Sequence, residues 1–137
     1  MSEAAATLND DGLCFGCGPH NPIGLRLTFA WDEDVYRTQW TPAPEHQGWA
    51  GIVHGGLLAL ALDETLSRAA LERYGLHWVT AELNTRLRRS ARVGVPLVIE
   101  ARVESVRPKL IVCRGEIREA ESGRTIATGE VKLMRVR

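Results

Sequence analysis

The residues best suited to chemistry lie between Gly51 and Ser67, where a glycine-rich turn leads into an apolar segment that carries an acidic pair, Asp63 and Glu64. Glu64 has Arg68 four residues later, which is the favourable orientation for an ion pair on a helix. The neighbours of Asp63 at helical spacing include no cation. Because an unpartnered charge in apolar surroundings is costly, Asp63 is the candidate nucleophile or general base. The structural alternative is an Asp held by backbone amides of a neighbouring segment.

Three small or polar residues, His54, Gly55 and Gly56, stand where the apolar segment begins. The first amide hydrogens of a helix have no acceptor within the helix and carry a partial positive charge. Glycine lets a ligand approach such a backbone closely. These amides therefore suit a carbonyl oxygen that becomes negative during acyl transfer. Alternatively, the two glycines only allow the chain to turn.

The spacing of the two groups predicts how they act together. Gly56 and Asp63 are seven residues apart, so they lie on nearly the same face of a helix but about 10 Å apart along its axis. One scissile carbonyl does not reach both groups within one chain. We therefore expect a homodimer in which the amides of one subunit face the carboxylate of the other.

The element that positions these groups is a helix from Gly55 to Tyr74, which ends at Gly75, a residue type favoured just past a helix end. A helix that is apolar on almost every side is buried, so we expect it at the centre of the fold.

Strands are predicted on both sides of this helix, because apolar and polar residues alternate there. They cover Leu25 to Trp31, Val35 to Thr41, His77 to Arg89, Val95 to Val106, Lys109 to Glu119 and Arg124 to Val136. The alternation places Leu83 on an apolar face and Thr80 on the opposite, polar face. A long antiparallel sheet curled around one buried helix is the α+β arrangement that this order permits.

Length and composition narrow the classes of protein. A chain of 137 residues suits one domain, predicted over 12–137, after a mobile segment 1–11. Lys plus Arg equals Asp plus Glu at 17 each, which argues against nucleic-acid binding. We find no apolar run of membrane-spanning length and no signal peptide, so the cytoplasm is the expected location.

Cys14 and Cys17 form a Cys-x-x-Cys, with His20 three residues later. A structural zinc site normally takes four ligands, and the distant Cys113 is the further thiolate available. A redox role lacks the surrounding strand and helix of thioredoxin-like proteins. We assign neither a metal nor another cofactor from the sequence.

The sequence Gly51-Ile-Val-His-Gly-Gly, with Asp63 nine positions after His54, resembles the hotdog-fold acyl-CoA thioesterases, in particular the branch related to the phenylacetate-degradation thioesterase. The leader from Cys14 to Leu25, Cys-Phe-Gly-Cys-Gly-Pro-His-Asn-Pro-Ile-Gly-Leu, is also seen in many bacterial members. The resemblance extends over nearly the whole chain.

This resemblance implies a hotdog fold, a long central helix wrapped by a curved antiparallel sheet, with two chains paired edge to edge and active sites at their interface. It implies that the amide of Gly56 polarises a thioester carbonyl while Asp63 of the partner acts on it or on water. Gln47 would help to hold the carbonyl or the water, and Thr80 would place a hydroxyl nearby. His54 would support the turn or line the site.

The resemblance also implies an acyl-CoA substrate and a homodimer or a dimer of such dimers, without a cofactor. Coenzyme A carries phosphates, which the planar guanidinium of arginine binds well. The densest basic cluster consists of Arg86, Arg88, Arg89 and Arg92. Solvated arginines at a strand end are the alternative interpretation of this cluster.

Two other functions stay open. One is hydration of an enoyl thioester on the same fold, although the pattern of that branch is not found here. The other is a non-catalytic acyl-CoA-binding protein. The length of the bound acyl chain depends on which of Trp49, Leu57, Leu58, Ala61 and Trp78 line the site.

Overall fold

The computed structural model describes residues 8–136. Their secondary structure follows the predicted order of two strands, one helix and four strands. The elements are β1 (Ala30–Asp32), β2 (Val35–Trp40), the short 3-10 helix η1 (Pro44–His46), α1 (Gly55–Tyr74), β3 (Trp78–Leu87), β4 (Leu97–Val106), β5 (Leu110–Glu119) and β6 (Thr125–Arg135).

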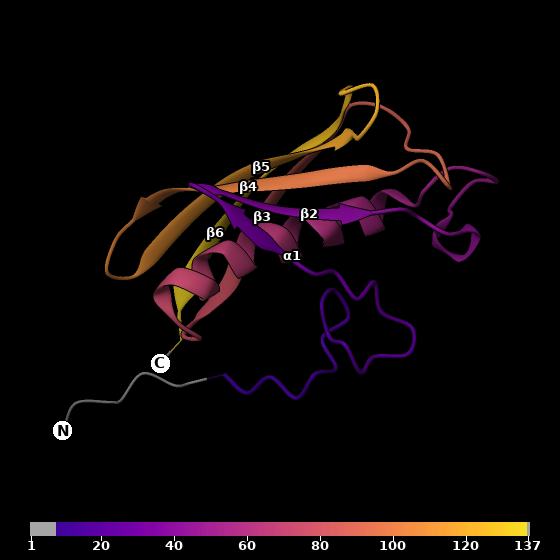
Figure 1. Ribbon diagram of the computed structural model, residues 1–137. Coiled ribbons are helices and arrows are strands. Elements are labelled where there is room, and N and C mark those ends of the chain that lie inside the picture. The colour runs from indigo at the N-terminus through magenta and orange to yellow at the C-terminus, as the bar shows by residue number, and fades with distance from the viewer. Residues whose placement is uncertain (1–7, 137) are drawn as a thin grey trace.

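The strands form one 6-stranded antiparallel sheet in the order β1-β2-β4-β5-β6-β3. The helix α1 lies across one face of this curved sheet (Figure 1). Fully buried side chains of α1, such as Leu62 and Leu66, belong to the same core as Ile99, Ile117 and Leu133 of the sheet. The predicted α+β architecture is therefore confirmed.

The helix has the predicted bounds, and its two ends explain them. His54 caps the first turn, and Gly75 ends the last turn with a φ of 93° that favours glycine. The prediction that the helix is buried on every side is wrong for the single chain. The sheet covers one face, whereas Asp63, Glu64 and Arg68 lie half-buried on the rest of its surface. None of the helices within residues 8–136 is long and apolar enough to cross a membrane.

The segment 12–25 lies on the side of α1 away from the sheet (Figure 1). Just before it, the backbone N–H of Leu8 donates to Leu76 O, and Arg68 forms an ion pair with Asp10. Of the segment predicted to be mobile, residues 1–7 lie outside the described residues.

The strand predicted from Leu25 to Trp31 is much shorter than expected, because only residues from Ala30 pair with β2. The backbone N–H groups of Leu25 and Leu27 donate to carbonyls of Phe15 and Gly16 instead. Leu27 is still buried, as the alternation requires. The apolar pattern thus predicts the burial of Leu27, but the hydrogen-bond partner of this segment is a loop rather than a strand.

The strand β3 contains an irregularity that changes the predicted faces. Its pairing with β6 shifts between Thr80 and Glu82, so that Thr80 lies opposite Leu133 and Leu83 lies opposite Val131. An extra residue in one strand moves the following side chains to the other face. Thr80 therefore shares the helix-facing side with Leu83, and the prediction that it lies on the opposite face is wrong.

Candidate functional site

Asp63 projects from the middle of α1, where Thr80 of β3 meets it. The Thr80 hydroxyl donates a 2.7 Å hydrogen bond to Asp63 Oδ1. Both side chains are half-buried. One carboxylate oxygen is thus held by a neutral donor, and the described residues provide no salt bridge to this acid. The arrangement orients Asp63 without neutralising it, which suits a nucleophile or a general base.

The start of α1 is organised by His54. Its Nδ1 accepts a 2.9 Å hydrogen bond from the backbone N–H of Gly56. Since a backbone amide is the donor, Nδ1 carries no proton, and the proton of the neutral ring lies on Nε2. The N–H of Gly55, in contrast, has no hydrogen-bond acceptor among the described residues. Of the two amides predicted to contact a carbonyl, Gly55 carries the free hydrogen.

Gln47 lies in the loop before α1, beside this turn. Its Oε1 accepts a 2.9 Å hydrogen bond from the N–H of Gly51, whose φ is 76°. The side-chain NH₂ group of Gln47 therefore points away from that bond. Gln47 is exposed, so this amide donor is open to solvent in the loop before α1.

Asp63 and the helix start are held at opposite parts of β3. A Cβ atom on Gly55 would lie 2.8 Å from Leu87 Cδ1, so the helix start packs beside the last residue of the strand. Thr80, near the beginning of the strand, contacts Asp63. The two halves of the candidate site thus lie about two helical turns apart in one chain.

The structure separates the four arginines. The register with β6 directs Arg86 to the outer face of the sheet, where Arg86, Arg88 and Arg114 line a hollow of ≈ 560 Å³. Arg92 instead forms a backbone bridge with Ile52, in the loop that leads to α1. Arg89 is exposed between them. Of these four arginines, Arg92 is therefore the one whose backbone lies close to the start of α1.

An open, mainly apolar cleft of ≈ 750 Å³ lies beside the same end of α1. It is lined by Leu57 of the helix and by Phe15 and Ile23 of the segment 12–25, among others. Of the side chains considered for the acyl group, Leu57 faces this cleft. Leu58, Ala61 and Trp78 are buried in the core, and Trp49 is 83% exposed.

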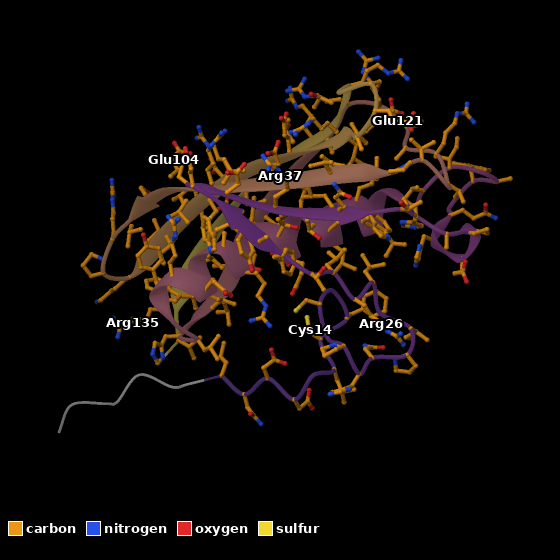
Figure 2. The ribbon with its side chains drawn as sticks, viewed as in Figure 1. Cys14, Arg26, Arg37, Glu104, Glu121 and Arg135 are labelled. Atoms are coloured by element: carbon orange, nitrogen blue, oxygen red, sulfur yellow. The ribbon has the colours of Figure 1, made fainter. Side chains whose placement is uncertain are left out.

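The side chain of Glu64 points to the segment 12–25 and not to the contact between Asp63 and Thr80. The predicted ion pair with Arg68 is confirmed, with Arg68 Nε 3.6 Å from Glu64 Oε1. The Cys14 thiol donates to the same oxygen over 3.4 Å, and the Arg68 guanidinium donates to Cys17 Sγ over 3.3 Å. Figure 2 shows the sulfur of Cys14 on the side of the loop that faces α1. Burial and the neighbouring Glu64 raise the pKa of the Cys17 thiol to about 12, although Arg68 acts in the opposite direction.

This grouping was missed at the sequence level, since the acid that joins Cys14 and Cys17 is 50 residues away along the chain. His20 lies against Gly12, and Cys113 is buried in β5. The four-ligand set of Cys14, Cys17, His20 and Cys113 is therefore not formed.

The family model of the thioesterase superfamily matches residues 50–134, from the turn before α1 almost to the end of β6. The chain belongs to the thioesterase superfamily. The matched residues include Asp63, Thr80 and the His54-Gly-Gly turn, and they leave out the segment 12–25. The predicted relationship to hotdog thioesterases is confirmed. A comparison with curated proteins gives no match.

Solved structures agree with this assignment. The thioesterase superfamily protein RHA08564 is 28% identical with a TM-score of 0.81, over 90% of this chain and 60% of that chain. AziG of S. sahachiroi is 26% identical with a TM-score of 0.74, over 82% of this chain and 93% of that chain. The E. coli PaaI protein from the phenylacetic acid degradation operon is 22% identical with a TM-score of 0.73, over 81% and 84%. This superfamily member thus spans less than two thirds of the length of RHA08564. Its similarity to PaaI, at 22% identity, is a similarity of fold alone.

Proposed function

We propose that the protein is an acyl-CoA thioesterase, which hydrolyses an acyl-CoA thioester to a carboxylic acid and free coenzyme A. The observation that carries this proposal is the orientation of Asp63 by Thr80 on a helix whose start presents a free amide hydrogen. A carboxylate and an oxyanion-binding amide are the two groups that acyl transfer to water requires.

In the proposed reaction, the thioester carbonyl accepts the N–H of Gly55. The N–H of Gly56 joins when the His54 imidazole turns away from it. The NH₂ group of Gln47 is the further donor at that end. Asp63 either takes a proton from the water that attacks the carbonyl carbon, or attacks that carbon itself. Both routes break the carbon–sulfur bond and release coenzyme A as its thiol, which takes up a proton that the water loses. In the second route, water then hydrolyses the mixed anhydride between the acyl group and Asp63.

Two chains are needed for this chemistry, and β3 supports a particular pairing. β3 is an edge strand of the described sheet, and its Val79, Leu83 and Leu87 are exposed although apolar. A long apolar edge strand readily pairs with another chain. Thr80 contacts Asp63 and Leu87 contacts Gly55, so an antiparallel pairing of two β3 strands about a two-fold axis near Leu83 brings Asp63 of one chain towards Gly55 of the other.

Arg92 is the proposed contact for the coenzyme A phosphates, since its backbone lies beside the loop that ends at the helix start. Arg86, Arg88 and Arg89 are more remote contacts for the same phosphates. The cleft beside Leu57 is the proposed site of the acyl group.

The activity is tested with a panel of acyl-CoAs by following the ultraviolet absorbance of the thioester, which the three cysteines of the protein do not disturb. We expect hydrolysis of at least one member and near-complete loss in Asp63→Asn. Glu64→Gln is expected to cost far less, and Glu72→Gln, an exposed acid on the same helix, serves as the control. Full activity of Asp63→Asn would refute the assigned role.

The shared site is tested by mixing two inactive variants, Asp63→Asn and Gly55→Pro, under conditions that exchange subunits. A mixed dimer has one site with both defects and one site with neither. Random exchange then restores about a quarter of the wild-type sites. If all groups act within one chain, mixing restores nothing.

A further inference from the structure

A second cluster of reactive side chains lies outside the proposed thioesterase site. Cys14, Cys17 and Glu64 each direct one potential ligand atom to a common point, and these three atoms lie within 4.8 Å of one another. All three residues are half-buried. We refer to these three residues as the thiol–carboxylate cluster.

We propose that the thiol–carboxylate cluster binds one zinc-type divalent ion, which attaches the segment 12–25 to the middle of α1. Thiolates select zinc and related soft transition metals over magnesium and calcium. A carboxylate oxygen is an accepted third ligand of zinc. Among the described residues no further cysteine, histidine or acid joins this group, so the fourth position belongs to a water molecule.

The distances between the ligands fit such an ion. Zinc lies about 2.3 Å from a thiolate and about 2.0–2.2 Å from a carboxylate oxygen, so a tetrahedral site separates sulfur and oxygen by about 3.5 Å. Cys14 Sγ lies 3.4 Å from Glu64 Oε1. The Cys14–Glu64 pair therefore already has the separation that a shared ion requires, and all three atoms lie within 4.8 Å of one another.

Two glycines allow close packing of the loop, Gly16 against Glu64 and Gly18 against the loop's own backbone. A Cβ atom on Gly16 would lie 2.5 Å from Glu64 Cγ, and one on Gly18 would lie 2.4 Å from the backbone N of Cys14. The N–H of Gly18 donates a 2.8 Å hydrogen bond to Cys14 O, which completes a tight turn around the Cys-x-x-Cys. This turn directs both sulfur atoms to the same side, as chelation of one ion requires.

Arg68 supplies the charge and the outer contacts that a thiolate site needs. Its Nε and one terminal nitrogen both lie 3.3 Å from Cys17 Sγ, and it also pairs with Asp10. Hydrogen-bond donors around the ligands are a regular part of metal sites. Two thiolates and one carboxylate are balanced by a divalent ion together with the guanidinium, so the bound cluster is neutral.

The test uses the full-length protein, treated with a chelator and then titrated with Co²⁺ as a spectroscopic substitute for zinc. We expect one Co²⁺ per chain, a sulfur-to-cobalt charge-transfer band in the near ultraviolet, and loss of that band on addition of Zn²⁺. Glu64→Gln removes a proposed ligand and is expected to weaken binding by more than the roughly 10- to 100-fold that loss of an outer contact costs.

The charge-transfer band should be absent in the double variant Cys14→Ser with Cys17→Ser, whose hydroxyls can still donate to Glu64. It should persist in Cys113→Ala, the matched control for the remaining cysteine. Circular dichroism verifies that each variant is folded. A wild-type protein without the band, or a band that survives in the double variant, would overturn the proposal and leave the two thiols as hydrogen-bond donors to Glu64. Neither result depends on thioesterase activity.

Discussion

The Thr80 hydroxyl donates a 2.7 Å hydrogen bond to Asp63 Oδ1, across the packing of β3 against α1. The bond exists because the pairing of β3 with β6 shifts beside Thr80 and brings its side chain to the helix-facing side. A hydroxyl at this position fixes the direction of the carboxylate but leaves its charge intact.

Thr80→Val removes this donor with little change in shape. A hydrogen bond to a charged group is worth about 1.5–3 kcal/mol, so we expect kcat to fall roughly 10- to 100-fold. Thr80→Ser keeps the hydroxyl and should retain most of the activity. Steady-state kinetics on an accepted acyl-CoA compares the two variants. Equal rates for Thr80→Val and the wild type would contradict the positioning role.

Gly55→Pro removes the amide hydrogen that the proposed oxyanion contact uses. Proline is tolerated at the first position of a helix, and His54 already has the extended backbone, with φ −60° and ψ 129°, that a residue before proline prefers. Loss of one oxyanion donor costs about 100- to 1,000-fold in kcat. Gly55→Ala also adds a Cβ beside Leu87 but keeps the N–H, so it should lose much less. Similar losses in both variants would point to crowding rather than to the hydrogen.

Leu83→Glu places a charge at the centre of the exposed edge of β3. We expect the proposed dimer to dissociate, since charged residues on an edge strand oppose pairing with another chain. The rate of thioester hydrolysis should fall as the subunits separate, while circular dichroism shows an intact helix. Analytical ultracentrifugation measures the oligomeric state, and Val106→Glu at the exposed end of β4 is the control. A variant that is fully active as a monomer would exclude the shared site.

Gly115 and Gly129 lie opposite each other on β5 and β6 but differ in what a side chain would meet. A Cβ on Gly115 would lie 2.1 Å from the backbone O of Glu100, whereas one on Gly129 would lie 3.2 Å from Leu62 Cδ1. Backbone cannot move aside as a side chain can. We expect Gly115→Ala to lower the free energy of unfolding by about 3 kcal/mol and Gly129→Ala by about 1 kcal/mol. Urea unfolding of both variants gives the comparison, which fails if their order is reversed.

Cys113 should make stability depend on alkaline pH. Burial raises the pKa of its thiol from 9.0 to about 12. Because folding favours the protonated form, the contribution is complete below 9.0 and is lost as the pH rises to about 12. The difference in unfolding free energy between the wild type and Cys113→Ala should shrink across that interval. Urea titrations at several pH values measure it, and a constant difference would show that the thiol does not titrate as expected.

Local patterns allowed much of the fold to be predicted. The bounds of α1 follow from an apolar segment between His54 and Gly75, and both predicted ends are those of the structure. The strands after the helix agree within one or two residues at each end, since alternation depends on neighbours in the chain. Asp63 could be distinguished from Glu64 because Arg68 stands four residues further on, which is also a local relation.

The register between strands could not be predicted from the local alternation of apolar and polar residues. One extra residue in β3 reversed the predicted side of Thr80, and a single step in pairing moves every following side chain to the other face. The alternation around Leu27 likewise could not show that its N–H bonds to the loop at Gly16 instead of to a strand.

The sequence by itself determined the helix, the order of the strands, the identity of the candidate acid and the turn that begins the helix. Only the tertiary structure decided that His54 Nδ1 accepts a hydrogen bond from the N–H of Gly56. It also decided that the side chains of Cys14 and Cys17 lie beside that of Glu64. The physical reason is that helix and strand periodicity depends on residues a few positions apart. The direction of a donor, and the partner of a residue 50 positions away, depend on how distant segments pack together.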